Sequence, residues 1–184
     1  YALRWVAHDP QGANFNLLQL EQADSAKAAL QIASRVGVPT QNLLVADRQG
    51  VIGWTLIGAL PERQLTDMDT PQDWSTAKNR WTGYHAAKAY PAILNPKSGQ
   101  LWTANSRMIG GDDLALIGNG GYDLGARAQQ IRDGLTALPQ HTEQSLQQIQ
   151  LDHRALMLAR WQKLLLDQVL TADFVAEHQL TSYR

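Results

Sequence analysis

The segment Asn42–Gly58 constrains the fold more than any other part of the sequence. Two apolar runs, Asn42–Asp47 and Val51–Gly58, have the length and the aliphatic and β-branched content of strands. Between them lies Arg48-Gln49-Gly50, where glycine supplies the positive φ that a tight turn requires. The segment therefore predicts an antiparallel hairpin, and the chain must build a sheet that other elements cover.

The residues around this hairpin predict one further strand, one helix and one long loop. We expect a strand at Tyr1–His8, ended by the turn Asp9–Gly12, and a helix that follows Asn14–Leu20. Asp24 or Ser25 is its expected N-cap, its apolar stripe runs from Ala26 to Val36, and Gly37 and Pro39 end it. After Pro61–Arg63 leaves the sheet, Gln64–Pro91 is expected to be an extended loop.

The second half of the sequence changes from strand to helical patterning. Asn95–Gly99 is expected to form a turn that leads into a short strand at Gln100–Ala104, followed by a glycine-rich loop at Met108–Gly121. Two helices then follow, from about Tyr122 to Leu138 and from the N-cap Thr142 to about Leu170. This order predicts an α+β fold with a largely antiparallel sheet and packed helices.

Composition describes an ordinary globular protein and excludes several function classes. With 184 residues, 44% apolar and 18% charged, the chain can bury a core. Net charge is −1 with no Lys/Arg run, so nucleic-acid or anionic-membrane binding is not expected. No apolar run approaches 18 residues, so no membrane span is expected. Because there is no cysteine, the chain has no disulfide and no thiolate metal site.

Standard catalytic and metal-binding motifs are not found. There is no GxSxG, P-loop or HExxH motif, and the five histidines have no ligand spacing; His153 is expected within the long helix. Asp112-Asp113 and the loop acids Asp67, Asp69 and Asp73 could approach a hard cation, but solvated loop acids are the favoured interpretation. No serine has a recognisable base beside it in sequence; the serines are Ser25, Ser34, Ser75, Ser98, Ser106, Ser145 and Ser182.

One candidate site remains, formed by Ala104–Arg107 together with Arg127. An asparagine at the end of a strand, here Asn105, can offer its side-chain NH₂ to a developing oxyanion. An arginine on a following helix, here Arg127, can orient that asparagine. From the pattern alone, a turn-forming asparagine is the favoured interpretation.

Three blocks in this order resemble the penicillin amidase family of N-terminal nucleophile hydrolases. The first is NLLVADRQGVIGWTLIGALPER, Asn42–Arg63, which is similar to the family's hairpin, with Val51 where the family usually has Asn. The second is the segment Trp81–Arg107 with NPKSGQLWTANSR, which is similar to NPxSGxIxxAN. The third is the helix with Arg127-Ala-Gln-Gln-Ile131. The resemblance covers most of residues 1–165.

The resemblance implies a mechanism and assigns roles to two residues. A serine exposed at the start of the β-subunit attacks an amide carbonyl, with its own α-amine as base, and water releases the acyl-enzyme. Asn105 matches the oxyanion-hole asparagine, and Arg127 matches the arginine that orients this asparagine and the nucleophile's amine. No cofactor is expected, although family members may carry a structural calcium whose ligands cannot be assigned here.

The resemblance also sets the expected organisation of the chain. Residues 1–184 are expected to be a single fragment of a β-subunit domain, part of an αββα sandwich, with the sheet at about 1–107 and helices at about 122–170. Because the chain starts at Tyr1, we interpret it as a processed product or a piece of a longer periplasmic protein, inactive alone. Its expected partners are a small N-acyl amide substrate and the remaining segments of the α and β subunits.

Alternatives remain open from the sequence. Cleavage of a β-lactam side chain and deacylation of an acyl-homoserine lactone cannot be separated, because most of the acyl pocket would lie outside the chain. A non-catalytic binding or scaffold module of the same fold is a second possibility. The third is an unrelated α+β domain whose motifs match by chance.

Overall fold

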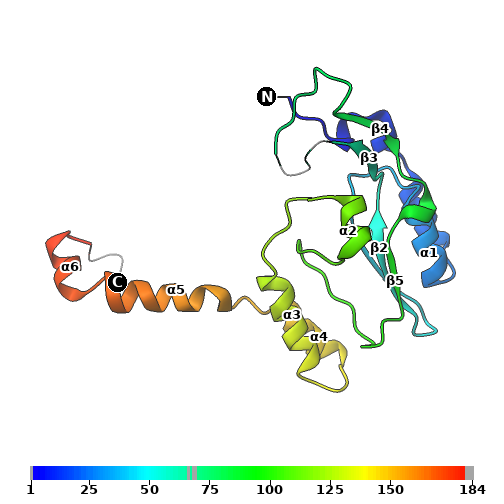
Figure 1. Cartoon of the computed structure of the whole chain (residues 1–184). Helices are drawn as coiled ribbons and strands as arrows, with labels where there is room; N and C mark the ends of the chain where they lie inside the picture. The colour runs from blue at the N-terminus through cyan, green and yellow to red at the C-terminus, as the bar shows by residue number, and fades with distance from the viewer. Residues whose placement is uncertain (1, 66, 68–69, 181–184) are drawn as a thin grey trace. The chain divides into compact units, whose positions relative to one another are not determined.

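Strand β2 (Ile52–Ile57) is the central strand of a three-stranded antiparallel sheet (Figure 1). The computed structural model describes residues 2–65, 67 and 70–180. β2 pairs with β1 (Gln41–Ala46) and with β5 (Ala92–Leu94), so that Trp54 lies opposite both Leu44 and Ile93. The predicted hairpin is confirmed, including the positive φ of +80° at Gly50.

The two faces of β2 pack against different helices. Trp54 and Leu56 belong to a cluster that includes Ile117, the last residue of α2 (Gly111–Ile117). Ile57, on the opposite face, packs with residues of α1 (Ala26–Ala33) and of the turn that follows it: Ile32, Ala33 and Val36. Because successive strand side chains point to opposite faces, a helix covers each side of the sheet.

One carboxylate joins the start of α1 to the hairpin turn. Ser25 is the N-cap and accepts a hydrogen bond from Ala28 N at 3.2 Å, as predicted. Asp47 Oδ2 accepts from Ala26 N, while Asp47 Oδ1 accepts from the amides of Gln49 and Val51, each at 3.0 Å. These amides, chiefly that of Ala26, lower the pKa of Asp47 below its ordinary value. The turn and the helix start are therefore stabilised by the same side chain.

The predicted loop at Gln64–Pro91 is wrong in part. β3 (Pro61–Gln64) and β4 (Arg80–Tyr84) form a separate antiparallel pair, and the segment also contains the short helix η4 (Ala87–Ala89). Pro61–Arg63 therefore leaves the three-stranded sheet, as predicted, but continues as a strand of the separate β3–β4 pair. A register shift lies between Glu62 and Arg63, and such an irregularity breaks the alternation from which strands are predicted.

Three other predicted elements differ from the structure. The expected N-terminal strand is replaced by short 3₁₀ turns, η1 (Val6–His8) and η2 (Pro10–Gly12), and η3 (Asn16–Gln22) follows them; Tyr1 lies outside the described residues. Asp9 Oδ1 accepts from Gln11 N at 2.9 Å, which favours the turn. No strand forms at Gln100–Ala104. The predicted loop at Met108–Gly121 contains α2.

The chain divides into two compact units, one ending at Asp123 and the other beginning at Leu124. In the second unit, α3 (Ala126–Thr136) packs against α4 (Glu143–Gln150). A Cβ added at Gly134 would lie only 3.0 Å from Ile149 Cγ1, so the absence of a side chain allows this approach. Thr142 caps α4 as predicted, in a reciprocal pair of bonds with Ser145.

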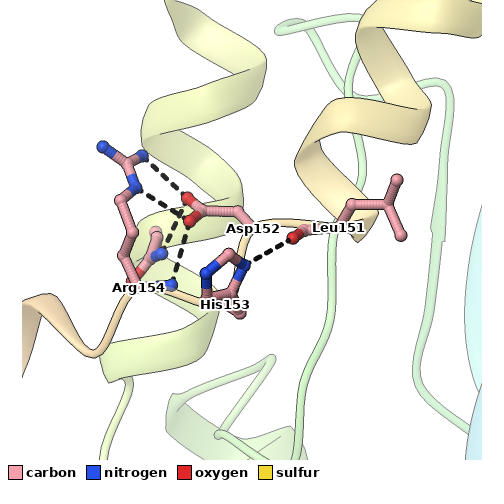
Figure 2. A network of polar contacts seen from close by, with 5 residues as sticks. Leu151, Asp152, His153 and Arg154 are labelled. Carbon is pink, nitrogen blue, oxygen red and sulfur yellow. Dashed lines mark hydrogen bonds and ion pairs between the residues drawn. The ribbon is translucent and has the colours of Figure 1, made fainter.

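The predicted long helix ends at Gln150 instead of continuing to Leu170. Figure 2 shows the contacts that follow this end: Asp152 accepts from Arg154 Nε and Nη2 at 2.8 Å each, and from Arg154 N at 3.1 Å. His153 therefore lies outside a helix, with Nδ1 near Leu151 O. Side-chain bonds to nearby backbone compete with helical bonds. Helical structure resumes in η5 (Leu156–Leu158), α5 (Ala159–Leu164), the π-helical η6 (Leu165–Val169) and α6 (Ala172–Glu177).

None of the helices within the described ranges is long and apolar enough to cross a membrane.

Candidate active site

Asn105 lies at the centre of a three-residue turn. Ser106 N donates to Ala104 O at 2.6 Å, and φ at Asn105 is not positive, which together define an inverse γ-turn. Asp123 N donates to Asn105 O at 2.8 Å. Main-chain hydrogen bonds therefore hold the chain on both sides of this residue. Asn105 is exposed, and it lines a cleft.

The segment that leads into this γ-turn is hydrogen-bonded to β2. Asn95 N donates to Ile52 O at 2.9 Å, and the Asn95 side chain accepts from Ile52 N at 3.0 Å. Asn95 has a φ of +46°, and Gly99 has a φ of +66° and donates to Pro96 O at 2.8 Å. The predicted turn at Asn95–Gly99 is therefore confirmed. It directs the chain toward Leu101, which packs on the Trp54 cluster instead of forming a strand.

The cleft has a volume of about 480 Å³, and all of its lining residues lie in the first unit. Its floor includes buried residues of the Trp54 cluster, among them Leu56, Leu60 and Ile117. Asn42 lines it too, and its side-chain oxygen accepts from Trp54 Nε1 at 2.9 Å. A buried tryptophan thus fixes the orientation of one amide in the wall.

Two arginines also line the cleft, and sequence analysis assigned no role to either. Arg63 donates from Nη2 to Ile117 O, and its Nε is buried without a hydrogen-bond partner. Burial lowers the pKa of Arg63. The guanidinium of Arg4 lies 4.7 Å from the centre of the Trp81 ring, a cation–π contact. No aspartate or glutamate is among the lining residues.

The other predicted site residue, Arg127, belongs to the second unit. It is the second residue of α3, after the N-cap Gly125, and it is exposed. Asn105 and Arg127 therefore belong to different units. The joint role expected for them stays a prediction.

The structure also places a histidine beside a serine, which sequence analysis missed. His141 Nδ1 lies 3.0 Å from Ser145 Oγ, and His141 Nε2 lies 2.7 Å from Leu135 O. The prediction concerned bases beside a serine in the sequence, whereas His141 lies four residues before Ser145 and reaches it through the fold. However, Ser145 Oγ also accepts from Thr142 N at 2.9 Å, and it serves the cap of α4. The spacing of four residues between His141 and Ser145 was the signal in the sequence that could have revealed this contact.

No group of three or more metal-ligating side chains was found within residues 2–65, 67 and 70–180. Asp67 accepts from Thr70 Oγ1 at 2.6 Å, and Asp73 accepts from Ser75 N at 2.9 Å. Asp69 lies outside the described residues. These local contacts belong to the loop itself.

Comparison with known proteins identifies relatives over nearly the whole chain. The penicillin amidase family model matches residues 1–182. The acyl-homoserine lactone acylase QuiP of Pseudomonas aeruginosa is 27% identical over 161 residues, 88% of this chain and 19% of that protein. Penicillin acylase 2 proenzyme of Pseudomonas sp. strain SE83 is 26% identical over 176 residues, 93% of this chain and 23% of that protein.

A solved structure shows the same fold. Thermostable penicillin G acylase from Alcaligenes faecalis matches with a TM-score of 0.60 and 21% identity, over 90% of this chain and 30% of that one. The predicted α+β class and the N-terminal nucleophile hydrolase fold are thereby confirmed. The chain spans about a fifth of the length of the two curated relatives. Because the model of the penicillin amidase family matches residues 1–182, the chain belongs to this family.

Proposed function

We propose that this chain is part of an acylase that hydrolyses a linear amide bond in a small N-acyl compound. The observation that carries the proposal is the placement of Asn105. A γ-turn fixes its backbone, and the residue lines the cleft. A side-chain N–H held in this way can donate to a tetrahedral oxyanion without reorganising during the reaction. A β-lactam acyl side chain and similar N-acyl groups are the proposed substrates.

The proposed reaction needs a nucleophile from outside this chain. An N-terminal serine gives its hydroxyl proton to its own α-amine, and its oxygen bonds to the amide carbon. The oxyanion accepts from Asn105 Nδ2 until the C–N bond breaks and the amine leaves with the proton. Water then releases the acid from the acyl-enzyme. Arg127 is proposed to orient Asn105 and the serine's amine, and the 184-residue chain alone is proposed to be inactive.

Acyl-homoserine lactone deacylation is the second candidate. It is favoured by the 27% identity to the P. aeruginosa lactone acylase over 88% of this chain. Both candidates are amide hydrolases, and they share the role proposed for Asn105. The periplasmic location stays a prediction.

The proposal is tested in the full-length protein that carries this chain. Phenylacetyl and long-chain acyl amides serve as reporters, and Asn105→Ala should reduce hydrolysis by about 10²–10³-fold while substrate still binds. Gln22→Ala, which changes an exposed amide in η3, is the matched control. Near-wild-type turnover in Asn105→Ala would mean that Asn105 is only a turn residue. Hydrolysis by the 184-residue chain alone would overturn its proposed inactivity.

A separate experiment tests Arg127. Arg127→Ala should impair both maturation of the precursor and turnover, because the nucleophile's amine and the asparagine lose a common anchor. Arg132→Ala, on the same helix and paired with Asp133 at the surface, is the control. If the precursor of Arg127→Ala is cut normally and turns over at the wild-type rate, the role assigned to Arg127 is wrong. An N-terminal Ser, Thr or Cys on the mature β-chain separates the enzyme from a non-catalytic module.

A further inference from the structure

We propose that the helical segment Leu156–Val169 is an interface, and that it packs against the part of the full-length protein that lies outside these 184 residues. The segment comprises η5, α5 and η6 of the second unit. The proposal goes beyond the proposed function, because it concerns assembly and does not depend on which bond the protein hydrolyses. Its physical basis is an apolar surface that the described residues of the second unit leave uncovered.

Large apolar side chains face solvent along the whole of this interface segment. Every leucine, methionine, tryptophan and valine in it is at least 37% exposed, and Trp161 is 52% exposed. A helix that is apolar around most of its circumference is normally buried, and a continuous exposed apolar patch marks an interaction site. Tryptophan is also among the residues that anchor interfaces most strongly. The segment therefore has the surface of a buried helix.

The charged residues of the segment lie along one narrow stripe. Arg160, Lys163 and Asp167 follow one another at spacings of three and four residues, which place side chains on the same side of a helix. Lys163 Nζ contacts Asp167 Oδ2 at 2.5 Å, and the Lys163 side chain is 79% exposed. The stripe can therefore stay in water while the apolar remainder is covered. It predicts which side of the helix faces outward.

The core of the second unit is too small to cover this surface. Among its described residues, 124–180, only Ala128, Leu170 and Val175 are buried. α5 makes its main contacts with η5 and η6, its neighbours along the chain, while α3 packs on α4. A unit that buries so little apolar surface does not offset the conformational entropy lost when it is ordered. The apolar surface therefore needs a partner.

The length of the relatives points to that partner. This chain covers 19% of the P. aeruginosa lactone acylase and 23% of the penicillin acylase 2 proenzyme. Most of each relative therefore lies outside the matched region, and a corresponding part of the full-length protein is available to cover the segment. Permanent interfaces are apolar, as this surface is. A lipid surface is disfavoured, because membrane-surface helices are rich in cations and this stripe has two, one of them paired with Asp167.

The first test measures how fast a single cysteine in the full-length protein reacts with a maleimide. This chain has no cysteine of its own, and any cysteine outside it is replaced by serine. Leu165→Cys, on the apolar side, should react about tenfold or more slowly than the matched control Lys163→Cys in the folded protein, and equally fast in urea. If Leu165→Cys does not fold, Met157→Cys replaces it with the same expectation. Similar rates for the two cysteines in the folded protein would overturn the interface.

Photo-crosslinking then identifies the partner. Leu165→p-benzoylphenylalanine in the full-length protein should crosslink to peptides outside the 184 residues, in a yield that does not change on dilution. A crosslink to a second copy or to the first unit would overturn the stated partner. So would cysteine protection that appears only with vesicles of phosphatidylglycerol and phosphatidylcholine. Absence of amide hydrolysis would overturn the proposed function and leave these results unaffected.

Discussion

Asn95 and Ile52 exchange two hydrogen bonds, one from each amide. Asn95 N donates to the main-chain oxygen of Ile52 at 2.9 Å, and Ile52 N donates to the side-chain oxygen of Asn95 at 3.0 Å. The side chain of Asn95 thus takes the place of a carbonyl that the turning backbone cannot present. With φ at +46°, asparagine suits this position, because it tolerates the left-handed region better than most residues.

We expect Asn95→Ala to destabilise the chain by about 1–3 kcal/mol, since it removes an acceptor and places a Cβ-bearing residue without side-chain compensation at positive φ. Asn95→Gly loses the same acceptor but relieves the backbone, so its cost should be smaller. The free energy of unfolding from urea denaturation measures both variants. A glycine variant less stable than the alanine variant would contradict the assignment of strain to this position.

Asn105→Ala should lower the free energy of unfolding less than a change that removes a main-chain donor of the turn, because Ser106 N and Asp123 N make two of the hydrogen bonds that hold it. Ser106→Pro, in contrast, removes the N–H that closes the γ-turn, and it should destabilise the chain clearly. Comparison of the two by urea denaturation separates the turn from the side chain. An Asn105→Ala variant as unstable as Ser106→Pro would show that the asparagine side chain itself holds the turn.

Asp47 should make stability depend on pH in the acid range. Its folded-state pKa lies below the unfolded value of about 3.9, chiefly because Ala26 N donates to it. The stabilisation is therefore present above about pH 4 and is lost as pH falls through the folded-state pKa. Asp47→Asn should be less stable than the wild type at pH 7, with a difference that shrinks below about pH 4. Urea denaturation across pH, with Glu21→Gln as the control, measures this; a constant difference would contradict it.

Gly53→Ala should destabilise the chain by about 1–3 kcal/mol through overpacking. A Cβ at this position would meet Leu30 Cδ1 at 2.9 Å, where α1 lies on the sheet. The same substitution in a Leu30→Ala background should cost much less, because the obstructing atom is gone. A double-mutant cycle by thermal or urea unfolding measures the coupling. Equal costs in both backgrounds would show that Leu30 is not the obstacle.

The hairpin could be predicted because its signals are local. Asn42–Asp47 and Val51–Gly58 match β1 and β2 to within one residue at each end, and Gly50 marks the turn between them. The caps Ser25 and Thr142 were likewise readable, because capping depends on a few neighbouring residues. The strand β4 was not readable, since its pairing with β3 is a long-range contact and Gly83 interrupts its apolar character.

Errors elsewhere arose where side chains compete for backbone hydrogen bonds. The apolar periodicity of the last third suggested one helix, but Asp152 binds the backbone and side chain of Arg154 and ends it. At Gln100–Ala104 the residues Leu101 and Trp102 suggested a strand, whereas Leu101 packs into the core and a γ-turn follows. Asn105 could be chosen from its motif. The buried Nε of Arg63, which makes no hydrogen bond, could be found only in three dimensions.

β2 pairs with a neighbour along each edge and is covered on each face, so its amides should be the slowest in the first unit to exchange with deuterium. The γ-turn at Asn105 and the β3–β4 pair have no such protection on both sides. Fluctuations can therefore open the rim of the cleft while Leu56, which packs in the Trp54 cluster, keeps its floor in place. A ligand of the cleft would then meet a rim that adjusts to its bulk and a floor that stays in place.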